Sequence, residues 1–326
     1  MRYVVYGAGA IGGTIAAALH SAGLDVVAIA RGPHLEAIRC DGLRVVGPDG
    51  ESVARIATAT SPADLDIGPE DVVILAVKSQ DTPAALTALA GADPEATVVC
   101  AQNGVANERE ALRHFRNVVG MHVWMVATHL EPGVTQVYTQ PAGVLDVGRY
   151  PHGTDERVDA ISADLALAGF DSRSQGDVMR WKYRKLLGNL ANAITALLGP
   201  QTERGDLAER ARSEGLACYA AAGIELVTRE EYESRVVGVR SDRSPGGRSQ
   251  PGGSSWQSIV RGTGSIEADH LNGEIVLLGR LHGVPTPVNQ VLQRAANDLA
   301  RRRGSPGDVS RDELERLIAA EPIAVS

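Results

Sequence analysis

The chain has 326 residues, which is more than one ordinary hydrophobic core accommodates and therefore suits two domains. Hydrophobic residues make up 44% of it and charged residues 22%, as in an ordinary globular protein. The net charge is -8 and charges of both signs are mixed along the sequence, which argues against broad binding to nucleic acid or to an anionic membrane.

The cysteines and the N-terminus bear on the cellular compartment. Cys40, Cys100 and Cys218 are scattered and odd in number, so they match neither a disulfide framework nor a metal-ligand spacing. We interpret all three as buried structural thiols and expect a cytoplasmic protein with no metal. The apolar run before the first glycines is too short for a signal peptide, and no apolar run approaches the roughly 20 residues of a membrane span.

The first half of the chain alternates strand and helix patterns. Such alternation predicts a doubly wound parallel sheet of the Rossmann type, with helices on both faces. A last segment, residues 133–150, is expected to add antiparallel strands. In chain order the expected elements are a strand at residues 3–7, a helix at 11–23, strands at 25–31 and 71–79, a helix at 82–91, a strand at 97–104 and a helix at 106–115.

The second half changes to long helical patterns, which predicts an all-helical domain. We place the boundary between a domain of residues 1–174 and a domain of residues 175–326. A stretch rich in Gly, Ser, Pro and Arg, residues 238–254, has little propensity for regular structure and is interpreted as a mobile segment at the mouth of a cleft. The predicted helices cover residues 177–198, 206–222, 265–282 and 286–302.

The sequence "GAGAIG" follows the first strand and opens the first helix. Gly7 permits a tight turn, Gly9 lets the backbone approach a pyrophosphate, and Gly12 lets helix and strand pack closely. Ala10 and Ile11 lie between them, where the backbone N–H groups of a helix N-terminus bind phosphates. We therefore predict a dinucleotide site rather than a glycine-rich turn without a ligand.

The end of the second strand indicates which dinucleotide binds. An NAD enzyme usually carries an acid there for the ribose hydroxyls, whereas this strand ends in "AIAR" and presents Arg31. A guanidinium binds the 2′-phosphate of NADP through charge-assisted hydrogen bonds, so NADP(H) is predicted over NAD(H). Lys78 follows a later strand at the same edge of the sheet, where a cofactor contact and a solvated lysine are equally good interpretations.

The helix "WKYRKLLGNLANAITALLG" carries polar residues in line. Lys182, Lys185, Asn189 and Asn192 lie on one stripe, the last three within about 40° of one another on a continuous helix. The stripe either lines a wet cleft or forms an exposed polar face, and we favour the cleft because the opposite side is apolar. A ketone that receives a hydride also needs a proton on its oxygen, and a lysine ammonium can supply it.

These motifs together resemble the ketopantoate reductase (2-dehydropantoate 2-reductase) family over nearly the whole chain. The segments that carry the resemblance are "GAGAIG", Arg31, "VKS" at 77–79, "QNG" at 102–104, "KLLGNLAN" at 185–192, "SSW" at 254–256, "GSIEADHLNG" at 264–273 and "GVPTPVN" at 283–289.

The resemblance implies a Rossmann domain joined to a helical domain, with the active site in the cleft between them. It implies that Lys185 is the general acid, and that Asn103 lies near both the nicotinamide and the substrate. By the same resemblance Asn189, Ser255 and, less directly, Asn192 match substrate-binding positions. Glu267 matches an acid that binds the substrate's hydroxyl and helps to place the lysine.

The chain departs from the family pattern in two places. Asn189 and Asn192 are three residues apart where the family has four, and the chain has Trp256 and Ile259 where the family has a methionine and an acid. The leading interpretation is NADPH-dependent reduction of ketopantoate to pantoate in pantothenate biosynthesis. The alternatives are a paralogue acting on another 2-oxo or hydroxy acid, and an NADP(H)-binding sensor without turnover. The sequence leaves open the role of Lys182 and the oligomeric state, a homodimer being one option.

Overall fold

The computed structural model divides the chain into two compact units. It describes residues 1–200, 202, 205–239 and 252–322. Of these, unit 1 contains residues 1–102, 107–182 and 228–239, and unit 2 contains residues 103–106, 183–200, 202, 205–227 and 252–322.

The main sheet of unit 1 has seven strands in the described residues, in the order β11-β8-β7-β6-β1-β2-β5. All neighbours are parallel except β11, which pairs antiparallel with β8. The central strands are runs of β-branched residues buried on both faces, as expected for a parallel sheet covered by helices. The strands are β1 (Arg2–Tyr6), β2 (Asp25–Ile29), β5 (Ala57–Ala59), β6 (Val72–Leu75), β7 (Thr97–Cys100), β8 (Asn117–Trp124) and β11 (Val144–Arg149).

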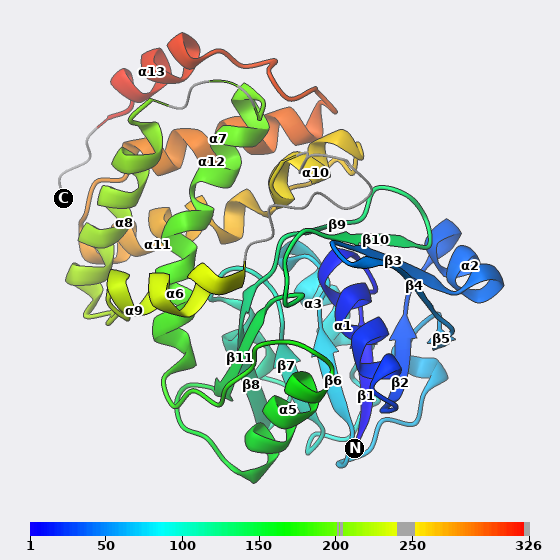
Figure 1. The fold of residues 1–326 in the computed structure, drawn as a ribbon. Coiled ribbons are helices and arrows are strands. Elements are labelled where there is room, and N and C mark those ends of the chain that lie inside the picture. Colours follow the sequence, from blue (N-terminus) through cyan, green and yellow to red (C-terminus); the bar gives the residue numbers. More distant parts are fainter. Residues whose placement is uncertain (201, 203–204, 240–251, 323–326) are drawn as a thin grey trace. The chain divides into compact units, whose positions relative to one another are not determined.

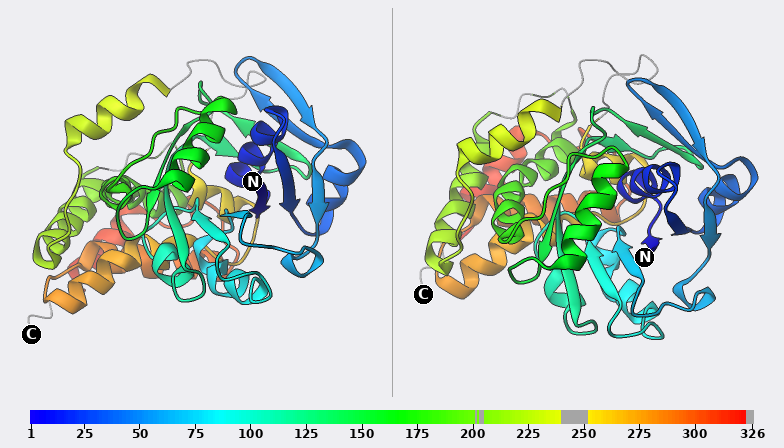
Figure 2. Two further views of the ribbon diagram at one scale, coloured as in Figure 1. Left: turned by 90° about the horizontal axis from the view of Figure 1, so that it is seen from below. Right: turned by 60° about the horizontal axis from the view of Figure 1, so that its bottom comes forward.

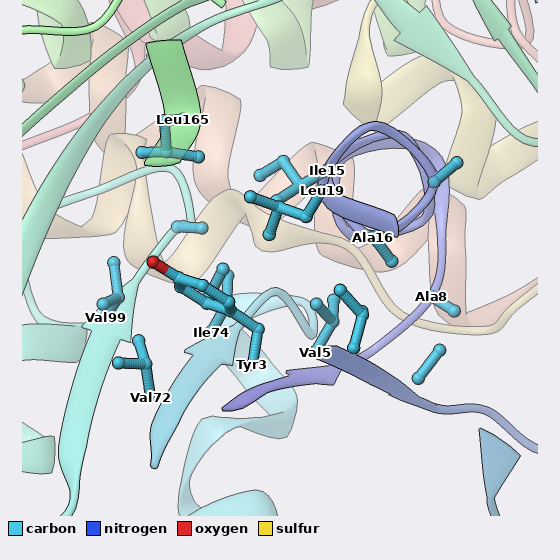
Figure 3. Close-up of a cluster of buried hydrophobic side chains, with 14 of the residues drawn as sticks. Tyr3, Val5, Ala8, Ile15, Ala16, Leu19, Val72, Ile74, Val99 and Leu165 are labelled. Carbon is cyan, nitrogen blue, oxygen red and sulfur yellow. The ribbon is translucent and has the colours of Figure 1, made fainter. Parts of the chain in front are cut away.

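Helices cover both faces of this sheet. On one face, α1 (Ala10–Ser21) and α5 (Glu156–Leu167) lie next to each other, as both views of Figure 2 show. Side chains from β1, β6 and β7 meet those of the two helices there in one buried cluster (Figure 3). On the other face, α3 (Thr82–Ala88) and α4 (Asn107–Ala111) contribute to a second cluster.

A second sheet packs against α1 and has the strand order β4-β3-β10-β9. Its strands are β3 (Leu43–Gly47), β4 (Gly50–Ala54), β9 (Ala127–Thr128) and β10 (Val134–Val137). The remaining short helices of unit 1 are α2 (Gly32–Asp41), η1 (Pro62–Asp64), η2 (Ser79–Asp81) and η3 (Val237–Val239).

A late helix, α9 (Arg229–Val236), belongs to unit 1 because buried contacts tie it to the main sheet. The Arg235 guanidinium donates to both carboxylate oxygens of Asp146 on β11, at 3.0 and 2.6 Å. Burial alone would raise the pKa of Asp146, but the nearby His122 ring and the hydrogen bonds from Arg235 outweigh it and lower that pKa. The ring of Tyr232 packs edge-on against His122 of β8, with centroids 5.4 Å apart.

Helix α6 (Val178–Asn189) starts in unit 1 and ends in unit 2 (Figure 1). In unit 2, α12 packs against α7, α8, α11 and α13, and α10 packs against α7. The helices of this unit are α7 (Ala191–Leu198), α8 (Leu207–Ala222), α10 (Ser254–Val260), η5 (Glu267–His270), α11 (Asn272–His282), α12 (Pro287–Arg301) and α13 (Arg311–Ala319).

The predicted fold class, a Rossmann-type sheet followed by a helical region, is confirmed. The two strands expected in residues 133–150 do not pair with each other, since β10 joins the second sheet and β11 the main one. The two compact units divide between Lys182 and Tyr183, whereas the predicted boundary follows residue 174, and α9 belongs to unit 1. A sequence pattern marks where helices begin, but only packing determines which core they join.

Other expectations have mixed outcomes. Cys100 and Cys218 are buried free thiols, whereas Cys40 is exposed, so its interpretation as a buried residue was wrong. The predicted mobile segment at 238–254 lies mostly outside the described residues. Among the residues that are described, none of the helices is long and apolar enough to cross a membrane, and no cluster of His, Cys, Asp and Glu is placed to hold a metal ion.

Candidate functional site

The carboxyl ends of the central strands form the edge where the predicted cofactor residues gather. Strand β1 lies between β2 and β6, so the chain changes direction across the sheet beside β1. Open α/β sheets bind ligands in the crevice at such a switch point. Gly7 follows β1, with a φ of 104°, and a Cβ atom there would lie 2.8 Å from the backbone nitrogen of Val77. The structure therefore brings the glycine turn next to the segment that carries Lys78.

The N-terminus of α1 is open to an anion. Gly9 is its N-cap without a capping side-chain hydrogen bond, and the first turn contains no acid. The backbone N–H groups of Ala10, Ile11 and Gly12 belong to this first turn, where an α-helix offers no internal acceptors. A Cβ atom on Gly9 would have no atom within 4 Å, whereas one on Gly12 would lie 2.2 Å from the Gly7 carbonyl oxygen. The residues present thus fit a dinucleotide pyrophosphate.

Two alanine variants separate these two glycines. Gly12→Ala should lower the free energy of unfolding by about 1–3 kcal/mol, because the new methyl group collides with backbone and forces α1 away from β1. Gly9→Ala should leave the melting temperature unchanged but weaken NADPH binding roughly tenfold, since its methyl enters the space predicted for the pyrophosphate. Thermal melts and fluorescence titration with NADPH measure both. Equal loss of stability in the two variants would contradict the assignment.

Arg31 occupies the position predicted for recognition of the cofactor phosphate. It follows β2 and serves as the N-cap of α2, with extended backbone angles. Its side chain is exposed, and within the described residues no hydrogen bond or ion pair holds the guanidinium. No carboxylate stands between the end of β2 and Arg31, so the group that would repel a 2′-phosphate is absent there.

His34 links α2 to the glycine turn, a contact that the sequence did not suggest. Its Nδ1 accepts a hydrogen bond from the Gly133 N–H at 2.9 Å, so the proton is on Nε2, which donates to the Ala8 carbonyl at 2.6 Å. Burial lowers the pKa of His34, which favours this neutral form. The imidazole therefore fixes the backbone of the turn between Gly7 and Gly9.

A second group of predicted residues comes together in unit 2. The ammonium of Lys185 on α6 donates to the Asn103 Oδ1 at 2.7 Å. Both side chains are half-buried. Because Asn103 follows β7 in sequence and Lys185 lies 82 positions later, this pairing depends on the fold and not on local spacing. An ammonium held in place by a neutral acceptor is suited to donate a proton.

The Asn103 segment also contacts the short helix that carries Glu267. Gly104 has a φ of 79°, and a Cβ atom there would lie 2.9 Å from the carbonyl oxygen of His270 in η5. Only glycine permits this approach. Glu267 is buried at the start of η5, and its Oε2 accepts a hydrogen bond from the Ser254 hydroxyl at 3.1 Å. The sequence pointed to Ser255, which is also buried, but it missed Ser254.

The two asparagines of the stripe lie on different helices. The predicted helix over 177–198 is wrong at its centre, since α6 ends at Asn189 and α7 begins at Ala191. The break coincides with Gly188 and Asn189, which are poor helix formers. The Asn189 Oδ1 is buried and has no hydrogen-bond partner in the described part of the chain. Asn192 lies beside Gly253, the residue that precedes α10 and Ser255.

Lys182 does not share the surroundings of Lys185. Its side chain is 3% exposed and forms an ion pair with Glu108 of α4, which is 0% exposed. Its ammonium also donates to the carbonyl oxygens of Cys100 and Gln102, at 3.3 and 3.1 Å. These contacts lie in unit 1. The predicted single polar stripe is therefore split, because Lys182 belongs to a buried ion pair and Lys185 to the group that contains Asn103. Sequence reasoning missed Glu108, an acid in the first turn of α4.

Two family models match the chain. "Ketopantoate reductase PanE/ApbA" matches residues 3–152, and "Ketopantoate reductase PanE/ApbA C terminal" matches residues 177–300. The chain belongs to the ketopantoate reductase family. Curated relatives agree: the 2-dehydropantoate 2-reductase of Halobacterium salinarum is 30% identical, over 93% of this chain and 100% of its own length. The 2-dehydropantoate 2-reductase of Mesorhizobium japonicum is also 30% identical, over 93% and 99%.

Solved structures share the fold of this ketopantoate reductase family member. A family member from Ralstonia eutropha superposes with a TM-score of 0.77 at 24% identity, covering 93% of this chain and 99% of that one. A D-mandelate dehydrogenase bound to NADH and anilino(oxo)acetate superposes with a TM-score of 0.78 at 20% identity, with the same coverage. At these identities the likeness shows the fold alone.

The second departure from the ketopantoate reductase pattern, at Trp256 and Ile259, falls on α10. Ile259 is buried, so the position of the family's acid belongs to the apolar interior here. Trp256 is half-buried, and its ring lies against the backbone of Gly252. Both residues share a seven-residue helix with Ser255, and so they alter the immediate surroundings of a residue predicted to bind substrate.

Proposed function

We propose that the chain is an NADPH-dependent reductase that converts ketopantoate to pantoate, a step of pantothenate biosynthesis. Family membership makes it a pyridine-nucleotide-dependent oxidoreductase, and curated relatives of equal length bear the name 2-dehydropantoate 2-reductase. The observation that carries the proposal is the hydrogen bond between Lys185 and Asn103, because it presents an ammonium held in a defined direction.

Lys185 acts in this proposal as the proton donor. NADPH, when bound, supplies the hydride to the carbonyl carbon of the keto acid. Negative charge then develops on the carbonyl oxygen, and the Lys185 ammonium stabilises it and transfers a proton to it. Asn103 orients the ammonium through its Oδ1 and can donate from its amide nitrogen to substrate or nicotinamide.

Other polar side chains of unit 2 hold the substrate in this proposal. The buried Oδ1 of Asn189, which has no partner among the residues that the structure describes, suits a hydroxyl donor, because an unsatisfied buried acceptor is costly without a ligand. Glu267 accepts from the substrate's hydroxyl, and its bond from Ser254 fixes the direction of the carboxylate. Ser255 and Asn192 complete the set from the α10 side of the unit.

The preference for NADP(H) over NAD(H) rests on Arg31 and on the lack of an acid after β2. Arg31 would hold the 2′-phosphate, while the turn at Gly7 and Gly9 and the N-terminus of α1 hold the pyrophosphate. Lys78 lies at the same edge of the sheet and is half-buried, which favours the cofactor-contact interpretation over a solvated lysine.

Another 2-keto acid is the second candidate substrate. Trp256 and Ile259 replace a methionine and an acid of the family pattern, so α10 is bulkier and less polar next to Ser255. An aromatic 2-keto acid would suit such surroundings. A sensor that binds NADP(H) without turnover is disfavoured by the Lys185–Asn103 pair, since binding alone does not require a positioned proton donor.

A cytoplasmic location accompanies this proposal. Cys100 and Cys218 are buried thiols, and burial raises the pKa of each, so both remain protonated. Such thiols suit a reducing compartment, where NADPH is also the ordinary source of hydride.

A substrate panel tests the proposed function. NADPH consumption is followed at equal concentrations of ketopantoate, 2-ketoisovalerate, pyruvate and benzoylformate. We expect the highest kcat/KM with ketopantoate. A higher value with benzoylformate would replace ketopantoate by an aromatic substrate, and NADPH binding without consumption on any of the four would support the sensor.

A further inference from the structure

We infer that the buried ion pair between Lys182 and Glu108 is a positioning device for the Lys185–Asn103 pair. The inference rests on the proposed function and extends it to two residues that touch neither substrate nor cofactor. Lys182 and Lys185 lie three residues apart on α6, yet their ammonium groups have different partners. The ammonium of Lys182 is buried in unit 1, whereas the ammonium of Lys185 donates a hydrogen bond to the Asn103 side chain.

Protein groups surround the ammonium of Lys182. It donates hydrogen bonds to the carbonyl oxygens of Cys100 and Gln102 and forms an ion pair with the Glu108 carboxylate. These three partners equal in number the three N–H groups of a lysine ammonium. Lys182 therefore neither binds the substrate carboxylate nor donates a proton in the reaction. This answers the question of its role that the sequence left open.

The acceptors of Lys182 lie on both sides of residues 103–106. Gln102 directly precedes this segment, and Glu108 follows it in α4. A single ammonium thus closes the two ends of a short loop, and Asn103 is the first residue inside it. Closing a loop at both ends reduces the conformations open to the residues between.

Buried hydrogen bonds fix the same two ends in unit 1. The Gln102 side chain donates to the Thr82 hydroxyl at 2.8 Å, and that hydroxyl donates to the Asn107 Oδ1 at 2.7 Å. Asn107 in turn donates to the Ser79 hydroxyl at 3.3 Å. Cys100 and Gln102 before the loop, and Asn107 and Glu108 after it, are therefore held by Lys182 or by side-chain hydrogen bonds. This leaves the backbone of Asn103 little conformational freedom.

The charge balance makes the pair a single unit. Glu108 is fully buried, and neither of its carboxylate oxygens has a hydrogen-bond partner among the described residues, so the ion pair with Lys182 compensates its charge. Removing one partner of such a buried pair leaves an uncompensated charge, whereas neutralising both avoids this. The negative charge of Glu108 adds to burial in raising the pKa of the neighbouring Cys100 thiol, while Lys182 opposes it.

The test uses Glu108→Gln, Lys182→Met and the double variant. We expect each to lower kcat with ketopantoate by about 10- to 100-fold, since small misplacements of catalytic groups have effects of this size. The double variant should be no worse than either single one, because the two side chains act as one unit. The KM for NADPH should change by no more than about threefold, since the glycine turn and Arg31, which are predicted to hold the phosphates, are not part of the network.

A matched control separates positioning from a general loss of stability. The double variant Arg235→Met/Asp146→Asn removes another buried ion pair of unit 1 and should lower the melting temperature but leave kcat within about twofold. The side-chain amide resonance of Asn103, assigned by its absence in Asn103→Ser, supplies a readout that needs no turnover. The chemical shift of this resonance should change in Lys182→Met/Glu108→Gln and should be unchanged in Arg235→Met/Asp146→Asn.

The possible results distinguish a failure of the positioning role from a failure of the proposed function. Glu108→Gln is nearly isosteric, so it decides the matter if Lys182→Met fails to fold. A kcat within threefold of wild type together with an unmoved Asn103 resonance would overturn the positioning role. If the wild-type protein reduces no keto acid, the proposed function fails, and the resonance alone decides whether the ion pair positions Asn103.

Discussion

Replacing Lys185 by alanine is expected to lower kcat with ketopantoate by about 100-fold or more, the usual range for the loss of a general acid. The variant removes the ammonium that bonds to Asn103 at 2.7 Å, and no other lysine of unit 2 can take its place, because the chain's remaining lysines are Lys78 and the engaged Lys182. NADPH affinity should change little, since the predicted cofactor residues of unit 1 are untouched. Steady-state kinetics and NADPH fluorescence titration measure the two quantities.

The control for Lys185→Ala is the neighbouring Arg184→Ala. Arg184 precedes Lys185 on α6 and donates to the Val227 carbonyl at 2.8 Å, so its loss perturbs the same helix without removing the proton donor. We expect Arg184→Ala to retain turnover within about threefold. Wild-type-like turnover in Lys185→Ala would remove the residue from the chemistry, and an equal loss in both variants would indicate damage to α6.

Arg31→Ala should raise the KM for NADPH by about 10- to 100-fold, as expected from the loss of a charge-assisted hydrogen bond worth roughly 1.5–3 kcal/mol. The KM for NADH should not rise, because NADH lacks the 2′-phosphate. The variant should therefore lose its discrimination between the two cofactors, with kcat nearly unchanged. Initial rates over a range of each cofactor, at saturating keto acid, give both constants.

Arg39→Ala provides the matched control for Arg31→Ala. Arg39 lies on the same helix, α2, and also carries an exposed guanidinium, but it pairs with Glu36 and bonds to Thr58. Its removal takes away one positive charge near the same edge and should leave the KM for NADPH within about twofold. An unchanged KM for NADPH in Arg31→Ala would instead show that another group recognises the phosphate.

The main elements of the sheet followed from the sequence because parallel strands buried on both faces are continuous β-branched runs. The strands β1, β6 and β7 are largely such runs, and a glycine or polar residue follows each of them within three positions. Strands β3 and β4 of the second sheet escaped prediction because they are short and partly exposed. The return of α9 to unit 1 was also unpredictable, since it depends on the ion pair between Arg235 and Asp146, 89 positions apart.

The candidate site shows the same division between local and distant signals. The glycine turn and Arg31 were found because their motif is contiguous and its chemistry is specific. Lys182 and Lys185 could not be told apart, since helical spacing places both on one stripe and gives no information on burial. What separates them is Glu108, a residue 74 positions earlier in the sequence whose role appears only when α4 and α6 pack.

The most direct test of the central claim, hydride transfer to a keto acid with a proton from Lys185, is isotopic. The protein is incubated with ketopantoate and NADPH deuterated at the transferable position of the nicotinamide, and the product is examined by NMR and mass spectrometry. The account predicts pantoate with one deuterium on the carbon that bears the new hydroxyl, formed at least about 100-fold more slowly by Lys185→Ala. Deuterated pantoate formed equally fast by Lys185→Ala, or none formed by wild-type protein that binds NADPH, would contradict it.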